Sequence, residues 1–272
     1  MPKNKFANIT IHPNSAKLSA GNFKVERSAW HKGNLNYFPA KKEQFADLNT
    51  LAKEFVFKGF GPDSPIFGDG DKVVTMGSCF ADRLRAWLNA NGKGTTYINV
   101  PEGLNNSFAV RQYLEWALTG DRSTDAYWYD NDKTLGAFQW QPDQEQQKLL
   151  QHFKEVSAVV VTFGLGEVWK DVETNNVFWR GVPAKFYDPS KHKCVTSTVQ
   201  ENVDNMKRIV DLIQTHAGAD TAVIFTLSPV PLNATFTNRP TIVSDCVSKS
   251  ILRVRVSCMP VAAVRLRLNM CA

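Results

Sequence analysis

The chain has 272 residues, of which 43% are hydrophobic and 21% are charged, values that are ordinary for a globular protein with a full core. No run of 18 uninterrupted apolar residues occurs, so the pattern predicts no membrane-spanning segment and no membrane partner. The net charge of +6 is concentrated in residues 246–272, which hold five basic side chains and no acidic one, so the rest carries only +1. A nearly neutral body argues against nucleic acid as a partner.

The amino terminus has no apolar segment behind it, and we therefore expect no secretory signal. The five cysteines show neither the paired spacing of a metal site nor a disulfide framework. We expect a cytoplasmic protein with reduced thiols, without cofactor or metal.

Residues 1–70 show little periodicity and end in a cluster of turn-forming glycines and prolines. The pattern predicts an irregular N-terminal arm packed on the core, with one short helix near residues 41–53. Burial of large aromatic rings would anchor this arm. The candidate anchors are Trp30, Phe55, Phe57, Phe60 and Phe67.

From residue 73 the sequence alternates between short apolar runs and amphipathic stretches. The expected strands are 73–76, 95–100, 158–163 and 222–227, and the expected helices are 80–91, 107–118, 144–156 and 198–216. A capping box, Thr198-x-x-Glu201, opens the last helix, and residues 164–197 are expected to form a long loop. Strands that alternate with helices predict an α/β fold, a parallel sheet with helices on both faces.

Three of the expected strands run into segments rich in glycine, proline and polar residues. These segments are Gly77-Ser78-Cys79, Gly164-Leu165-Gly166-Glu167 and Ser228-Pro229-Val230-Pro231. Because the carboxyl ends of parallel strands share one edge of the sheet, where ligands bind, we expect the three segments to form one site.

The first segment places a candidate nucleophile at a strand-to-helix turn. Gly77 permits a sharp turn, and Ser78 and Cys79 then lie at the start of the next helix, whose dipole favours an anion. Cys79 is the preferred nucleophile because a thiolate needs less help from a base than a serine does. Ser78 is the second candidate, and an unreactive, buried Cys79 is the structural alternative.

The run Gly77-Ser78-Cys79-Phe80-Ala81 is the signature of the GSCFA family, and the resemblance extends to the lead-in around Trp30 and to residues 73–253. This family resembles the SGNH, or GDSL-type, hydrolases, which have a flavodoxin-like three-layer parallel sheet and act on esters. An ungapped match of Gly-Asp-Ser-Leu to residues 77–80 places Cys79 at the nucleophile. The resemblance implies an esterase or acyltransferase that forms an acyl-enzyme on a small-molecule or carbohydrate ester.

The second segment lies where SGNH enzymes carry Gly-x-Asn-Asp, whose Asn donates to the oxyanion. Gly166 stands at the Asn position and offers only its backbone N–H. The resemblance therefore implies an oxyanion site of backbone amides, with Cys79, Gly103 and Gly166 as the candidates. Glu167 would orient the substrate or a base, a solvated loop carboxylate being the alternative.

Further candidates for contact with substrate lie near the same edge. Trp169, Trp179 and Arg180 follow the second segment and would line a groove, unless they only pack the loop onto the sheet. Asn105, Asn106 and Ser107 lie at the start of an expected helix near this edge, and capping alone would explain them.

The general base is missing from the pattern. SGNH relatives carry an Asp-x-x-His near the C-terminus, whereas no histidine follows His216 in this chain and none lies in that motif.

We divide the sequence into an arm (1–70), a GSCFA/SGNH-like domain (71–254) and a non-family tail (255–272). The tail predicts a truncated or frame-shifted C-terminal part and an inactive chain. The alternative function is a non-catalytic module that binds a polar ligand at the same edge, and nucleic-acid binding would depend on the tail alone.

Overall fold

The computed structural model describes residues 9–11, 17–20, 23–26, 39, 42–56, 65–77, 79–98, 105–121, 142–178, 182, 184 and 187–256. The chain divides into two compact units, Met1–Asp63 and Ser64–Ala272. Among the anchors expected in the arm, Trp30, Phe57 and Phe60 lie outside the described residues. Phe55 and Phe67 are half-buried.

The first unit contains a small antiparallel sheet and a short helical stretch. The sheet has the order β1-β2-β3, with β1 at Ile9–Ile11, β2 at Lys17–Ala20 and β3 at Phe23–Glu26. The helical stretch comprises η2 (Lys42–Phe45), α1 (Leu48–Leu51) and η3 (Ala52–Val56). The short helix expected near residues 41–53 is therefore confirmed. The expectation of an irregular arm is wrong for residues 9–11, 17–20 and 23–26, because these segments pair with one another as strands, and strand formation depends on the partner strand.

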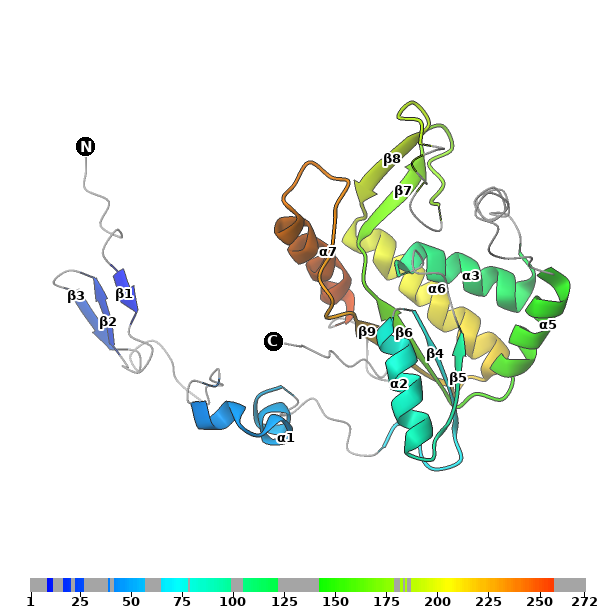
Figure 1. The fold of residues 1–272 in the computed structure, drawn as a ribbon, viewed down its shortest axis with the longest axis horizontal. Helices are drawn as coiled ribbons and strands as arrows, with labels where there is room; N and C mark the ends of the chain where they lie inside the picture. The colour runs from blue at the N-terminus through cyan, green and yellow to red at the C-terminus, as the bar shows by residue number, and fades with distance from the viewer. Residues whose placement is uncertain are drawn as a thin grey trace. The chain divides into compact units, whose positions relative to one another are not determined.

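Four parallel strands form the sheet of the second unit, in the order β5-β4-β6-β9 (Figure 1). They are β4 (Lys72–Met76), β5 (Gly94–Ile98), β6 (Ala158–Phe163) and β9 (Ala222–Leu227). All six residues of β6 are buried, as expected for a central parallel strand that is covered on both faces. The four expected strands and the parallel sheet are thus confirmed.

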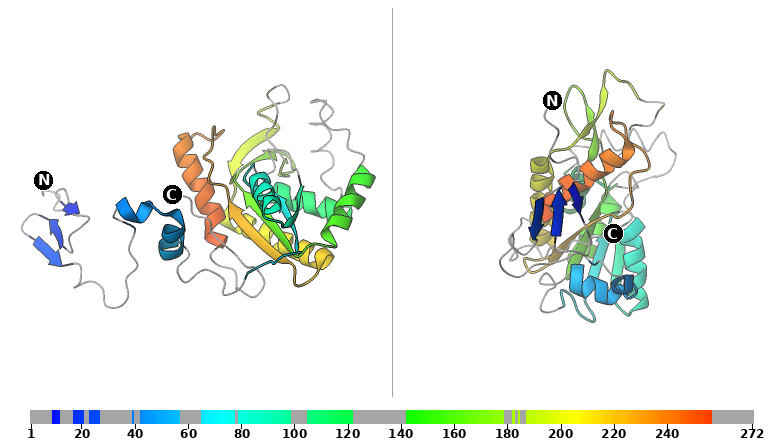
Figure 2. Two further views of the ribbon diagram at one scale, coloured as in Figure 1. Left: turned by 60° about the horizontal axis from the view of Figure 1, so that its bottom comes forward. Right: turned by 90° about the vertical axis from the view of Figure 1, so that its left-hand side faces the viewer.

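Helices pack on both faces of this sheet. On one face, α3 (Ser107–Thr119), α5 (Pro142–Phe153) and α6 (Val199–Ala217) share a core with Val74, Val161 and Phe225. On the other face, Leu88 of α2 (Cys79–Ala90) packs with Val73 and Val160. The right-hand view of Figure 2 shows the sheet between α2 and α6. No helix of the described stretches is both long and apolar enough to cross a membrane.

The structure corrects the sequence prediction in two places. Residues 164–197 do not form one long loop, because β7 (Glu167–Asp171) and β8 (His192–Thr196) pair as an antiparallel hairpin. Alternate residues of β7 are buried, the period that a strand requires. A further helix, α7 (Thr241–Val256), was not expected, and it packs against α6 and β9.

Candidate active site at the carboxyl edge of the sheet

The turn after β4 depends on a glycine. Gly77 has φ +121°, and a Cβ built at this position would lie 2.5 Å from the Thr162 carbonyl oxygen. Only glycine fits this left-handed, closely approached backbone. Cys79 then begins α2, and its side chain is exposed. The thiol is therefore open to solvent at a helix N-terminus, at the edge where the neighbouring strand β6 also ends.

The turn after β6 is held by hydrogen bonds to its peptide groups. The N–H groups of Gly164 and Leu165 both donate to the Asn105 carbonyl oxygen, at 2.8 and 3.1 Å. The Gly164 carbonyl oxygen accepts from Lys249 Nζ at 2.9 Å. Three sequence-distant segments, around Asn105, Gly164 and Lys249, thus meet at this turn.

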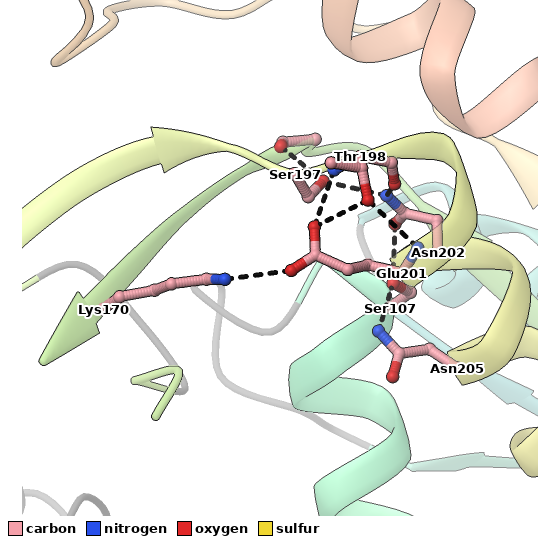
Figure 3. Close-up of polar contacts among 8 residues, drawn as sticks. Ser107, Lys170, Ser197, Thr198, Glu201, Asn202 and Asn205 are labelled. Atoms are coloured by element: carbon pink, nitrogen blue, oxygen red, sulfur yellow. Dashed lines mark hydrogen bonds and ion pairs between the residues drawn. The ribbon is translucent and has the colours of Figure 1, made fainter. Parts of the chain in front are cut away.

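A buried polar network holds the other end of this turn (Figure 3). The Gly166 carbonyl oxygen accepts from the N–H and the Oγ of Ser197, at 2.8 and 2.7 Å. Asn202 donates to Ser197 Oγ at 2.8 Å and accepts from Ser107 Oγ at 2.6 Å, and Asn205 donates to Ser107 Oγ at 3.0 Å. The four side chains are at most 2% exposed. The network therefore ties the first turns of α3 and α6 to the turn after β6.

The capping box of α6 adjoins this network. The Glu201 carboxylate accepts from the Thr198 N–H at 2.8 Å and from Lys170 Nζ at 2.9 Å, while Thr198 Oγ1 accepts from the Glu201 N–H at 3.1 Å (Figure 3). Burial opposes the charge of Glu201, but the hydrogen bonds from Thr198 and Lys170 outweigh it and lower the pKa of this carboxyl. The box read from the sequence is confirmed.

The two neighbouring asparagines before α3 have different roles. Asn106 is the N-cap, and its Oδ1 accepts from the Ala109 N–H at 2.9 Å. The Asn105 Oδ1 is buried and has no hydrogen-bond partner. A Cβ built on Gly164 would lie 3.6 Å from the Asn105 Cβ and 3.5 Å from the Ser228 Cβ, so the Asn105 side chain adjoins the ends of β6 and β9. A buried polar atom without a partner is typical of a ligand site.

The sequence interpretation placed Asn105 near this edge but explained it as part of the cap, so Asn105 was not made a site residue. The signal in the sequence was the pair of neighbouring asparagines: one helix needs only one N-cap side chain, so the second asparagine is free for another role.

The Glu167 carboxylate binds the loop after β9. It accepts from Thr235 Oγ1 at 2.7 and 3.0 Å, and the hydroxyls of Thr235, Thr237 and Ser244 lie within 3.2 Å of one another.

Cys194, on β8, is a second partly buried thiol. Burial, together with the charge of Glu167, raises the pKa of the Cys194 thiol to about 12. Cys194 is therefore a protonated thiol at neutral pH and is no competitor of Cys79.

Trp169 packs within an aromatic group on the hairpin. Its ring centroid lies 5.6 Å from that of Tyr187 and 4.9 Å from that of Phe236. Phe236 is 68% exposed, so this group faces solvent on one side. The other predicted site residues, Ser78, Gly103, Trp179 and Arg180, lie outside the described residues.

The described histidines are distant from the turn after β4. His152 and His216 end the helices that lead into β6 and β9, and so lie toward the opposite edge of the sheet. His192 begins β8 at the far end of the hairpin, where its Nδ1 accepts from the Asp188 N–H at 3.1 Å. Over the described ranges no three metal-ligating side chains gather.

These observations define an α/β protein whose sheet edge carries an exposed thiol, a firmly held glycine turn and an asparagine whose side chain adjoins that turn. A family model matches residues 72–263, a range that includes the whole parallel sheet and the candidate site. The chain belongs to the GSCFA family, as the signature predicted. No curated protein matches it.

Proposed function

We propose that this chain is an SGNH-like ester hydrolase or acyltransferase that forms an acyl-enzyme on Cys79, with O-acylated carbohydrates as the substrate class. The observation that carries the proposal is the exposed thiol at the N-terminus of α2, beside the glycine turn after β6. Such a position suits a nucleophile that attacks a carbonyl and needs donors for the oxyanion.

In the proposed reaction, Cys79 Sγ attacks the ester carbonyl and its proton passes to a base. The tetrahedral oxyanion collapses, the ester C–O bond breaks, and the alcohol leaves with a proton. Water or an acceptor hydroxyl then takes the acyl group from sulfur. The acyl group is transferred without any change of oxidation state.

The oxyanion donors we propose differ from those expected from sequence. The N–H groups of Gly164 and Leu165 already donate to the Asn105 carbonyl oxygen. The N–H of Cys79 is the first of α2 and has no partner within the helix, so it would be the first donor. The Asn105 side chain lies at the same edge, and its Nδ2 would be the second donor.

The base is not assigned to a described residue. SGNH-type relatives use a C-terminal Asp-x-x-His, which this sequence lacks. Without that motif, turnover would be slow and acylation would be the step to observe. The same observation favours a second function, non-catalytic binding of a polar ester or sugar at this edge.

The test is acylation by p-nitrophenyl acetate, followed by release of p-nitrophenolate and by the intact mass of the protein. We expect one acetyl group per chain, and its loss in Cys79→Ala. Cys246→Ala is the matched control, because Cys246, on α7, is also an exposed thiol. Acylation that survives Cys79→Ala but not Ser78→Ala would move the nucleophile to Ser78. An unmodified wild type that binds acetylated sugars would favour the non-catalytic module.

A further inference from the structure

A buried lysine on α7 joins two of the three segments that form the sheet edge. Lys249 is 8% exposed, and its Nζ donates to the carbonyl oxygens of Gly164 at 2.9 Å and Val230 at 3.0 Å. Asp245, one helical turn earlier, lies 3.7 Å from Nζ and accepts from the Leu232 N–H at 2.9 Å. Lys249 thus holds the turns that follow β6 and β9.

The absence of a side chain at Gly166 allows α7 to approach the turn closely at Ser248, the residue before Lys249. A Cβ built on Gly166 would lie 3.0 Å from the Ser248 Cα, so any larger side chain at 166 would displace the helix. Ser248 is fully buried, and its Oγ has no hydrogen-bond partner. Ser248 and Lys249 therefore bear directly on both glycines of the turn.

Packing alone does not explain a cation at this place. A methionine would fill a similar volume without the cost of removing a charge from water. What the ammonium adds is polarisation of a peptide group. The Gly164 carbonyl that it binds belongs to the same peptide as the Leu165 N–H, which donates to Asn105. Hydrogen bonds in such a chain strengthen one another.

We propose that Lys249 is a positioning residue of the reaction, whose charged amino group holds the Gly164–Leu165 peptide and, through it, Asn105 at the oxyanion. The proposal rests on the proposed function. It makes α7 a part of the active site rather than only a support of the sheet.

The test compares Lys249→Met and Lys249→Arg with the wild type in the acylation assay. Lys207→Met is the matched control, an exposed lysine on α6. We expect Lys249→Met to lower the maximal acylation rate about 10- to 100-fold, with little change in the ester concentration that gives half of that rate. Lys249→Arg, which keeps a cation, should recover most of the loss.

Two further readouts separate positioning from a general loss of structure. Alkylation of Cys79 by iodoacetamide creates no oxyanion, so its rate should stay the same in Lys249→Met. Burial lowers the pKa of Lys249, while Asp245 raises it and Arg253 lowers it. The two turns present carbonyl oxygens to Nζ. Wild-type acylation should therefore fall at alkaline pH as the ammonium loses its proton, whereas Lys249→Arg should keep its rate.

Equal acylation rates in the wild type and Lys249→Met would overturn the positioning role while leaving the acyl-enzyme intact. A parallel loss of alkylation and acylation would also overturn it, because the damage would then be structural. Absence of acylation in the wild type would overturn the proposed function and this inference together. If Lys249→Met does not fold, the acylation rates of the wild type and Lys249→Arg at alkaline pH decide the question. An identical fall of the acylation rate with rising pH in these two proteins would refute the proposal.

Discussion

The site rests on single residues whose backbone or side chain admits few replacements. Gly77 combines a left-handed φ with a close approach to the Thr162 carbonyl oxygen, whereas Gly92, at the end of α2, has φ +73° and no atom within 4 Å of a built Cβ. Gly92 therefore requires glycine only for its backbone conformation, whereas Gly77 requires it also because a side chain would clash with β6.

We therefore expect Gly77→Ala to destabilise the protein more than Gly92→Ala. The left-handed conformation alone costs about 1 kcal/mol for alanine, and at position 77 the clash with β6 should bring the loss to roughly 3 kcal/mol or more. Urea unfolding of the two variants measures both losses of stability. Equal losses would show that the backbone at position 77 relaxes away from Thr162.

The neighbouring asparagines offer a second comparison at this scale. Asn105→Ala should lower the acylation rate about 100-fold and leave stability nearly unchanged, because its side-chain oxygen has no partner to lose. Asn106→Ala should cost about 1 kcal/mol of stability through the lost cap, and acylation should persist. Rates and unfolding curves of both variants test this, and a reversed pattern would remove Asn105 from the site.

At the scale of elements, α6 carries the buried network that holds Gly166. Its first turn brings Asn202 and Asn205 to the start of α3, and its cap lies beside Lys170 of β7 (Figure 3). A buried network of this kind is stable only while each member has its partners.

Asn202→Ala removes three hydrogen bonds of this network and leaves the Ser107 and Ser197 hydroxyls short of partners. We expect a loss of roughly 2–3 kcal/mol, measured by urea unfolding. Asp204→Ala, an exposed change on the same helix, should shift stability by less than about 0.5 kcal/mol. Similar effects of the two variants would contradict a stabilising network.

The cap of α6 makes a pH prediction. The pKa of Glu201 is lowered below its ordinary value of 4.5 in the folded protein. A lowered acid pKa contributes stability that is present above the unfolded-state pKa and lost as the pH falls through the folded-state pKa. Glu201→Gln should thus be less stable than the wild type at neutral pH, and the difference should shrink as the pH falls below 4.5. Urea unfolding at several pH values measures the difference, and Glu173→Gln, a change at an exposed turn, is the control and should shift stability at neutral pH by less than about 0.5 kcal/mol.

At the scale of the whole molecule, the parallel sheet, both of its cores and every described site residue belong to the unit Ser64–Ala272. A chain that begins at Ser64 should therefore keep a cooperative thermal transition and the acylation of Cys79. Calorimetry and the acylation assay test this. Loss of folding in the shortened chain would show that the first unit is required by the second.

The sequence alone sufficed for elements whose signals are local. The apolar run 158–163, the capping box at Thr198 and the signature at 77–81 each identify their structure without knowledge of a partner, and the strand and helix patterns together defined a parallel α/β sheet. The sequence left both an exposed and a buried Cys79 open, and the structure shows an exposed one.

The sequence by itself thus determined the four parallel strands, the helices α2, α3, α5 and α6 between them, the strand-to-helix turn and the family, because periodicity, caps and glycine turns act over a few residues. Only the tertiary structure decided the β7–β8 hairpin, the helix α7, and the gathering of Asn105, Gly164 and Lys249 at one edge. Their roles depend on which buried groups meet across the fold, and burial and hydrogen-bond pairing are not set by neighbours in the chain.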